Sequence, residues 1–161
     1  MSNAKAHPID ISKISDDVLE AEYSRRFSFQ EGAEYVRSSD TASRGWQAAI
    51  LDKPRDQEHF GVMFLNGQNR IIKVEVMFTG SLTSSAVYPR EVIKRTLDLE
   101  AAAVIFFHNH PSGSMKPSIH DRKVTEKLQT ALEAIDVRLL DHLIIPSRGG
   151  GYFSFAEQEL L

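Results

Sequence analysis

The 161-residue chain has 42% hydrophobic and 25% charged residues, proportions typical of a globular protein with a core of its own. It contains no cysteine, which excludes disulfides, thiolate metal ligands and a cysteine nucleophile. The net charge of −3 comes without a basic arm, which argues against nonspecific nucleic-acid binding, and no apolar run reaches the roughly 18–20 residues of a membrane span. The N-terminus also lacks a signal-peptide pattern, so we expect a cytoplasmic protein that does not associate with membranes.

The first part of the chain is expected to be an N-terminal helical extension. Apolar residues recur at helical spacing within residues 16–50. The following stretch, 52–58, is highly charged and is interrupted by Pro54, which makes it the best candidate for a boundary. The sequence therefore predicts an extension over residues 1–57 and a domain over residues 58–161.

Two strands and a helix are predicted to open this domain. Residues 60–65 and 70–78 have strand character, and the Asn-Gly-Gln-Asn sequence at 66–69 is typical of a hairpin turn. Alternation predicts that one face of the second strand carries Ile72, Val74, Val76 and Phe78. A helix is expected to begin at Pro89, because proline is well suited to a first helical turn.

The second half of the domain alternates strands with one long helix. The continuous apolar run 101–107 predicts a central buried strand, followed by a loop over 108–117. Ser118 is expected to cap a helix, and strands are predicted at 138–145 and 152–155. The resulting order, β-β-α-β-α-β-β, predicts a mixed α/β domain with helices layered on a sheet.

Two histidines and an aspartate are spaced to form a metal site. His108 and His110 follow the buried strand and point to the same side of an extended chain, so both imidazoles can reach one ion. Asp121 lies in the first turn of the next helix, which the intervening loop can fold back over the strand end. Two nitrogens and one carboxylate oxygen suit Zn²⁺, and three protein ligands leave a position for water, as in catalytic rather than structural sites.

Hydrolysis would also require a base, and two upstream carboxylates compete for that role. Glu58 begins the first strand, on the face of its apolar, core-facing row. Glu75 shares its side of the strand with Lys73, which is typical of a solvated face. We therefore prefer Glu58. Ser118 is first of all a helix cap, but its hydroxyl can also stabilise an oxyanion.

Each of these residues also has a plainer interpretation. Taken alone, Asp121 is best explained as an acid at a helix N-terminus. His142 alternates with apolar residues and follows Asp141, which is typical of a hydrogen-bonded core histidine rather than of a ligand. The remaining histidines are expected at the surface: His7, His59 and His120.

The motif around the histidines resembles a known one. His108-Asn109-His110-Pro111-Ser112-Gly113, followed by Pro117-Ser118 and Asp121, is similar to the JAMM motif of JAB/MPN metalloproteases, and in detail to their bacterial RadC branch. Further similar stretches are Glu58-His59-Phe60, Tyr88-Pro89-Arg90-Glu91-Val92 and Leu140-Asp141-His142-Leu143-Ile144. The resemblance covers about residues 58–161.

The resemblance implies a function and a role for each site residue. It implies one Zn²⁺ per chain held by His108, His110 and Asp121, with Glu58 as the base and Ser118 as an oxyanion donor. It also implies a mixed sheet flanked by helices, in a cytidine deaminase-like architecture. The expected activity is that of a zinc metallopeptidase acting on a peptide or isopeptide bond of a peptide or protein substrate.

Two departures from the family pattern leave alternatives open. Residues 1–57 show no helix-hairpin-helix module, so the chain resembles a short RadC-like form and DNA binding cannot be carried over. Asn109 stands where deubiquitinating members have Ser or Thr, which argues against ubiquitin-like substrates. The alternative functions are a DNA repair or anti-restriction associated protein and a non-catalytic MPN scaffold. The substrate and the oligomeric state are not predicted.

Overall fold

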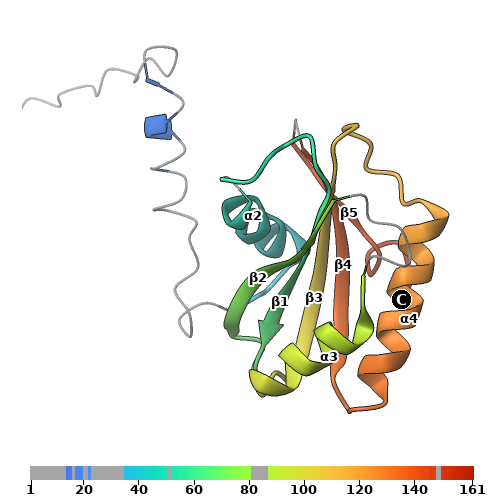
Figure 1. Ribbon diagram of the computed structural model, residues 1–161. Helices are drawn as coiled ribbons and strands as arrows, with labels where there is room; N and C mark the ends of the chain where they lie inside the picture. The colour runs from blue at the N-terminus through green and yellow to red at the C-terminus, as the bar shows by residue number, and fades with distance from the viewer. Residues whose placement is uncertain are drawn as a thin grey trace, which may run out of the picture.

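Strand-forming and helix-forming segments alternate as the sequence predicts. The computed structural model describes residues 35–50, 52–80, 87–147 and 150–161, together with 14, 15, 17–19 and 22 (Figure 1). Its elements are α2 (Ser39–Ala49), β1 (His59–Leu65), β2 (Ile71–Thr79), α3 (Pro89–Asp98), β3 (Ala103–His110), α4 (Ile119–Glu133), β4 (Arg138–Pro146) and β5 (Phe153–Ser154). From β1 onward, this is the predicted order of strands and helices.

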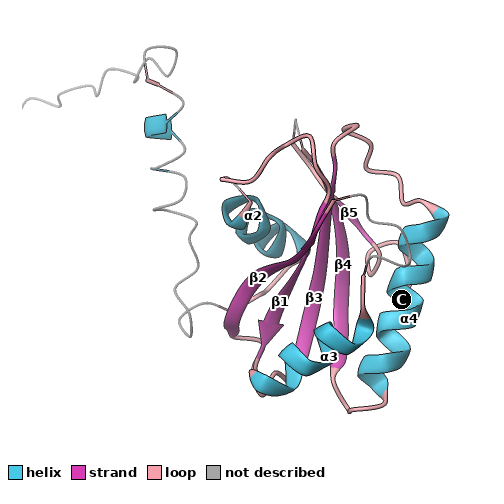
Figure 2. Cartoon of the chain, in the orientation of Figure 1, coloured by secondary structure: helices cyan, strands magenta, loops and turns pink. Residues whose placement is uncertain are grey.

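The strands form one mixed sheet, which confirms the predicted fold class. Its five strands lie in the order β2-β1-β3-β4-β5 (Figure 2). β3 and β4 are parallel, and α4 provides the crossover between them, whereas the other neighbouring pairs are antiparallel. Parallel neighbours place their carboxyl ends at the same edge of a sheet, where ligands commonly bind in α/β folds.

Helices cover both faces of the sheet. On one face, α3 and α4 pack against a core that includes Phe60 and Phe106. On the other face, α2 contributes Trp46, whose ring stacks on that of Phe107 with centroids 5.4 Å apart and planes 12° apart. Trp46 fits there because Gly61 lacks a side chain: a Cβ at that position would lie 2.1 Å from the Trp46 ring.

Helix α2 belongs to the region predicted as an N-terminal extension. It begins at its cap Ser38, whose side chain accepts a hydrogen bond from the Thr41 amide, and it packs on the sheet formed by the rest of the chain. The boundary predicted after residue 57 falls between α2 and β1 and stays a prediction. Most of the helical pattern predicted before residue 35 lies outside the described residues. Within the described ranges, none of the helices combines the length and apolar character that a membrane crossing requires.

Strand β2 does not present one apolar face, so that prediction is wrong. Its register against β1 shifts between Phe60 and Gly61 and again between Phe64 and Leu65. A bulge adds a residue to one strand and reverses the alternation beyond it. As a result, Ile72 and Phe78 pack on the α3/α4 side, whereas Val74 and Val76 pack on the α2 side.

Strand β3 also continues further than the sequence suggests. The segment 108–110 was predicted as the start of a loop, but its residues pair with β4 as far as His110 opposite Pro146. His108 also pairs with Phe60 of β1. Two strand neighbours therefore hold the His-x-His segment extended, and the loop is limited to residues 111–118.

Candidate metal centre

Three predicted ligands meet where β3 ends and α4 begins. His108 and His110 come from the last residues of β3, and Asp121 occupies the third position of α4. A capping box fixes the helix end: the Ser118 Oγ accepts from the Asp121 amide at 3.1 Å, and Asp121 Oδ2 accepts from the Ser118 amide at 2.6 Å. Asp121 therefore serves as a helix-end acid, as its plainer interpretation predicted, and its carboxylate also faces both histidines.

The three side chains bring their ligand atoms together. The Nε2 atoms of His108 and His110 lie 2.9 Å apart. Asp121 Oδ1 lies 3.2 Å from the His108 Nε2, and Asp121 Oδ2 lies 3.5 Å from the His110 Nε2. His108 and Asp121 are buried, while His110 is partly exposed. Among the residues that the structure describes, this is the group of three that can hold a metal ion, with access from the His110 side.

The hydrogen bonding of His110 shows why this cluster suits a cation. Its Nδ1 lies 2.8 Å from the carbonyl oxygen of Ser114, which can only accept, so Nδ1 carries a proton. In the neutral ring, Nε2 then holds a lone pair directed at the Asp121 carboxylate and the His108 Nε2. Several acceptor atoms facing one another require a positive charge between them, and two imidazole nitrogens with one carboxylate oxygen are a common zinc donor set.

The pKa values of Asp121 and His110 are also shifted in the directions that favour a positive charge in this cluster. Burial alone would raise the pKa of Asp121, but the interactions of its carboxylate with the His108 and His110 rings outweigh burial and hold that pKa well below its usual range. The pKa of His110 is raised, chiefly by its hydrogen bond to Asp121, against the opposing effect of burial. The negative charge of Glu58 contributes to the same rise. A proton on His110 and a metal ion therefore compete for one electrostatic site.

Glu58 lies beside this cluster. The pairing of β1 with β3 ends at Phe60 opposite His108, and Glu58 lies two residues before Phe60, near enough for its charge to raise the pKa of His110. Asn109 holds the backbone on both sides of Glu58: its Oδ1 accepts from the His59 amide at 2.6 Å, and its Nδ2 donates to the Gln57 carbonyl at 2.9 Å. Glu58, the preferred candidate for the base, therefore lies in the neighbourhood of the predicted ligands, and its role stays a prediction.

The sequence predicted no such role for Asn109. Its side chain is buried, and its Nδ2 also lies 2.7 Å from the Ser147 hydroxyl, just beyond β4. A buried amide with partners on both neighbouring strands ties three segments together at the edge of the site. The only signal in the sequence was a polar residue between two histidines, which does not reveal partners 38 and 50 residues away.

Comparisons with known proteins identify the family of this domain. A family model described as the RadC-like JAB domain matches residues 36–160. The chain belongs to the RadC-like JAB domain family. The match includes α2 as well as the sheet. Within this RadC-like domain, Trp46 of α2 and the triad therefore lie on opposite faces of the sheet.

Individual relatives show the extent of the similarity. The UPF0758 protein of Histophilus somni (strain 2336) is 46% identical over 139 residues, covering 85% of this chain and 61% of that protein. The UPF0758 protein of Actinobacillus succinogenes is 50% identical over 106 residues, or 66% and 47% of the two chains. The UPF0758 protein of Chromobacterium violaceum is 41% identical over 167 residues, or 98% and 74%. The RadC-like chain thus spans about three-fifths of the length of the Histophilus protein.

Glu75, the competing base in this RadC-like chain, has other partners. Its carboxylate accepts hydrogen bonds from Arg95 of α3 at 2.6 and 2.7 Å and lies 3.5 Å from the Lys73 ammonium. The hydrogen bond from Arg95 lowers the pKa of Glu75. Glu75 pairs with Val62 midway along the edge strand β2, away from the strand end that carries the triad. Its interactions are those of an ion pair that fastens α3 to the sheet.

The other histidines follow the predictions in part. His120 is exposed as predicted, and His7 lies outside the described residues. His142 is a buried, hydrogen-bonded residue, also as predicted. The prediction for His59 is wrong: it is 1% exposed, and its ring bonds to the Thr79 hydroxyl and the Pro54 carbonyl. These partners come from a loop and from the neighbouring strand, which the local sequence around His59 does not indicate.

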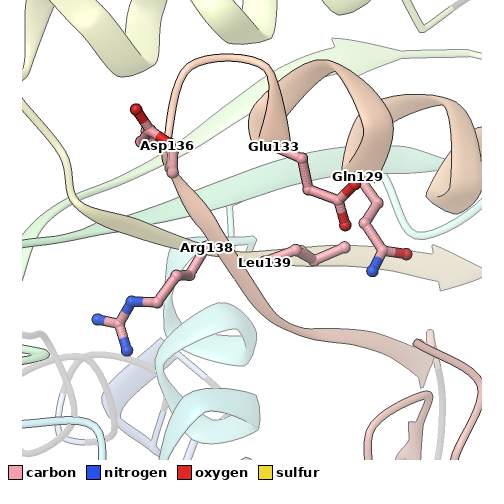
Figure 3. A pocket seen from close by; sticks show the side chains of 6 residues that line it. Gln129, Glu133, Asp136, Arg138 and Leu139 are labelled. Carbon is pink, nitrogen blue, oxygen red and sulfur yellow. The ribbon is translucent and has the colours of Figure 1, made fainter.

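A surface hollow lies at the opposite end of α4 from the triad. Figure 3 shows that Gln129 and Glu133 of the helix turn toward Leu139 of β4, while Asp136 and Arg138 point outward. Its lining mixes both signs of charge with apolar groups, and these side chains do not converge on one point.

Proposed function

We propose that the domain is a zinc-dependent hydrolase that cleaves a peptide or isopeptide bond. The observation that supports this most directly is the convergence of His108 Nε2, His110 Nε2 and the Asp121 carboxylate within hydrogen-bonding distances. Two nitrogens and one oxygen fit Zn²⁺, and a three-ligand set is the pattern of catalytic zinc sites. When bound in such a set, zinc supplies Lewis acidity that activates water and polarises a carbonyl.

The protein residues around the triad have separate roles in this proposal. Glu58 accepts the proton of the attacking water and passes it to the leaving nitrogen, a role that fits its electrostatic effect on His110. Asn109 keeps Glu58 there through its bonds to residues 57 and 59. The Ser118 oxygen accepts from the Asp121 amide, which leaves its hydroxyl proton available to a developing oxyanion.

The two alternative functions have less support. A non-catalytic scaffold would have no need for two imidazoles and a carboxylate directed at one another at an accessible strand end. A role in DNA repair or against restriction stays a prediction, since no contact or charge pattern of the described residues favours it. The location of the protein in the cell likewise stays a prediction.

Hydrolysis by matched variants tests the proposed base. The zinc-loaded chain is incubated with a proteome-derived peptide library, and new amino termini are counted by mass spectrometry. We expect Glu58→Gln to lower the cleavage rate by a factor of about 10²–10⁴ while retaining its zinc. Glu91→Gln, which removes an exposed carboxylate on α3, should cleave like the wild type. Equal cleavage by Glu58→Gln and the wild type would refute the role of Glu58.

A further inference from the structure

A series of buried hydrogen bonds links Asp121 and His108, two of the proposed metal ligands, through residues outside the triad. The Thr125 hydroxyl lies 2.6 Å from the Asp121 carbonyl oxygen and 2.6 Å from the His142 Nδ1. The His142 Nε2 lies 2.8 Å from the His108 Nδ1. Thr125, His142 and His108 are each at most 2% exposed. The path therefore runs from the backbone of one ligand to the ring of another without contact with solvent.

The donors and acceptors along this path can be assigned from its fixed end. The Asp121 carbonyl can only accept, so the single hydroxyl proton of Thr125 is directed at it. The Thr125 oxygen must then accept from His142, which places a proton on the His142 Nδ1. If the His142 ring is neutral, its Nε2 has a lone pair and can only accept from the His108 Nδ1.

The surroundings of His142 favour the neutral ring. Phe155 stacks on it with centroids 4.9 Å apart, and Phe60 and Phe106 meet it edge-on at 5.7 and 5.9 Å. The nearby Asp141 carboxylate accepts from the His142 backbone amide rather than from the ring. An imidazolium enclosed by aromatic rings, with no carboxylate bonded to it, would be strongly disfavoured.

We propose that Thr125 and His142 are positioning residues that hold His108 with its proton on Nδ1 and its Nε2 lone pair facing the metal. The inference rests on the metal site proposed above and deepens it. A neutral imidazole has two tautomers, and only one of them presents a lone pair at Nε2. Partners that fix the tautomer and orientation of a ligand histidine typically change metal affinity by 10- to 100-fold.

The hydrogen-bonded path from Asp121 through Thr125 and His142 to His108 also couples the positions of the two proposed ligands. Asp121 contributes its side chain to the metal site and its carbonyl to Thr125, while His142 reaches from β4 to His108 on β3. A shift of α4 along the sheet would therefore disturb the ring of His108 as well as the carboxylate of Asp121. An isolated pair of buried polar residues would not couple two ligands in this way.

Matched threonine variants separate this role from simple packing. Thr125→Val keeps the shape but removes the hydroxyl, and we expect it to weaken Zn²⁺ binding by 10- to 100-fold in competition with a chelator. Thr125→Ser should restore the affinity. Thr96→Val is the control, because Thr96 is also buried and bonds the carbonyl of Val92 four residues earlier, but lies in α3. Unchanged zinc affinity in folded Thr125→Val would overturn the proposal.

A second measurement decides the inference without metal. Nitrogen-15 spectra of the histidine rings in the metal-free wild type should show His142 with its proton on Nδ1. A proton on the His142 Nε2 instead would overturn the inference, even if zinc binds. Conversely, a wild type with the Nδ1 tautomer that takes up no zinc would refute the proposed function while leaving the hydrogen-bond assignment intact. His142→Gln, which retains an acceptor for His108, should bind zinc more tightly than His142→Leu.

Discussion

The side-chain oxygen of Asn109 accepts a 2.6 Å hydrogen bond from the backbone amide of His59. The Asn109 nitrogen donates to the carbonyl of Gln57, so the residue between them, Glu58, is held by its own backbone neighbours. The arrangement explains how a residue just outside β1 can keep a fixed place beside the ligands. It also assigns a structural reason to an asparagine between the two histidines of the triad.

Asn109→Ala is expected to lower the free energy of unfolding by about 1–3 kcal/mol, because buried backbone groups lose their partners. Urea unfolding of the zinc-free protein measures this effect. Gln68→Ala removes an exposed amide in the hairpin turn and should change the free energy by less than about 0.5 kcal/mol. We also expect Asn109→Ala to retain zinc but to hydrolyse more slowly. Equal stability of Asn109→Ala and Gln68→Ala would show that the hydrogen bonds of Asn109 to the backbone around Glu58 do not stabilise the fold.

Gly61→Ala is expected to destabilise the packing of α2 on the sheet. The added Cβ would lie 2.1 Å from the Trp46 ring and 2.7 Å from the Glu75 carbonyl oxygen, so either the helix or the strand must move. Overpacking of this kind typically costs about 1–3 kcal/mol. Thermal unfolding should show a clear drop for Gly61→Ala and little change for Gly67→Ala, whose new Cβ would meet nothing within 4 Å. Similar melting temperatures for the two variants would show that α2 is not packed as described.

Local patterns predicted much of the fold but not its irregularities. Runs of apolar residues located β1, β3 and β4 to within about two residues at most ends, and Ser118 and Pro89 marked helix starts because capping depends on neighbouring residues. Alternation failed in β2, since the register shifts opposite Gly61 and Leu65 depend on the partner strand. Such shifts carry no signal in the strand's own sequence.

In the candidate site, too, local sequence predicts some residues, whereas others depend on partners that are distant in the sequence. His108, His110 and Asp121 could be predicted together because one strand end and the following helix supply all three. The supporting residues could not be predicted. Asn109 bonds to His59, 50 residues away, and His142 bonds to His108, 34 residues away. These residues become neighbours only when the strands pair in the sheet.

Stability of the metal-free protein should be greatest near pH 6.5. The raised pKa of His110 means that its protonation stabilises the fold below about 6.5 and that this stability is lost as the pH rises through the higher folded value. Burial holds the pKa of His142 well below its usual value, so its contribution is present above about 6.5 and is lost as the pH falls. Urea unfolding between pH 5 and 9, after chelation, measures the profile.

A matched variant tests the cause of this profile. His110→Ala should lose the decline above pH 6.5, because no proton is then held beside Asp121. Added zinc should also abolish that decline, since the metal displaces the proton, and its apparent affinity should fall as the pH falls below the raised pKa of His110. A metal-free wild type whose stability keeps rising from pH 6.5 to 8 would refute the pairing of His110 with Asp121.

The central claim is that His108, His110 and Asp121 hold one metal ion. Elemental mass spectrometry of the wild type, Asp121→Ala and Glu126→Ala, purified side by side without added metal or chelator, tests it most directly. Glu126→Ala is the control, because it removes an exposed carboxylate from the same helix. We expect about one zinc per chain in the wild type and in Glu126→Ala, and essentially none in Asp121→Ala. A wild type that holds no metal even after zinc is supplied and the excess removed, or an Asp121→Ala variant with full zinc content, would contradict the claim.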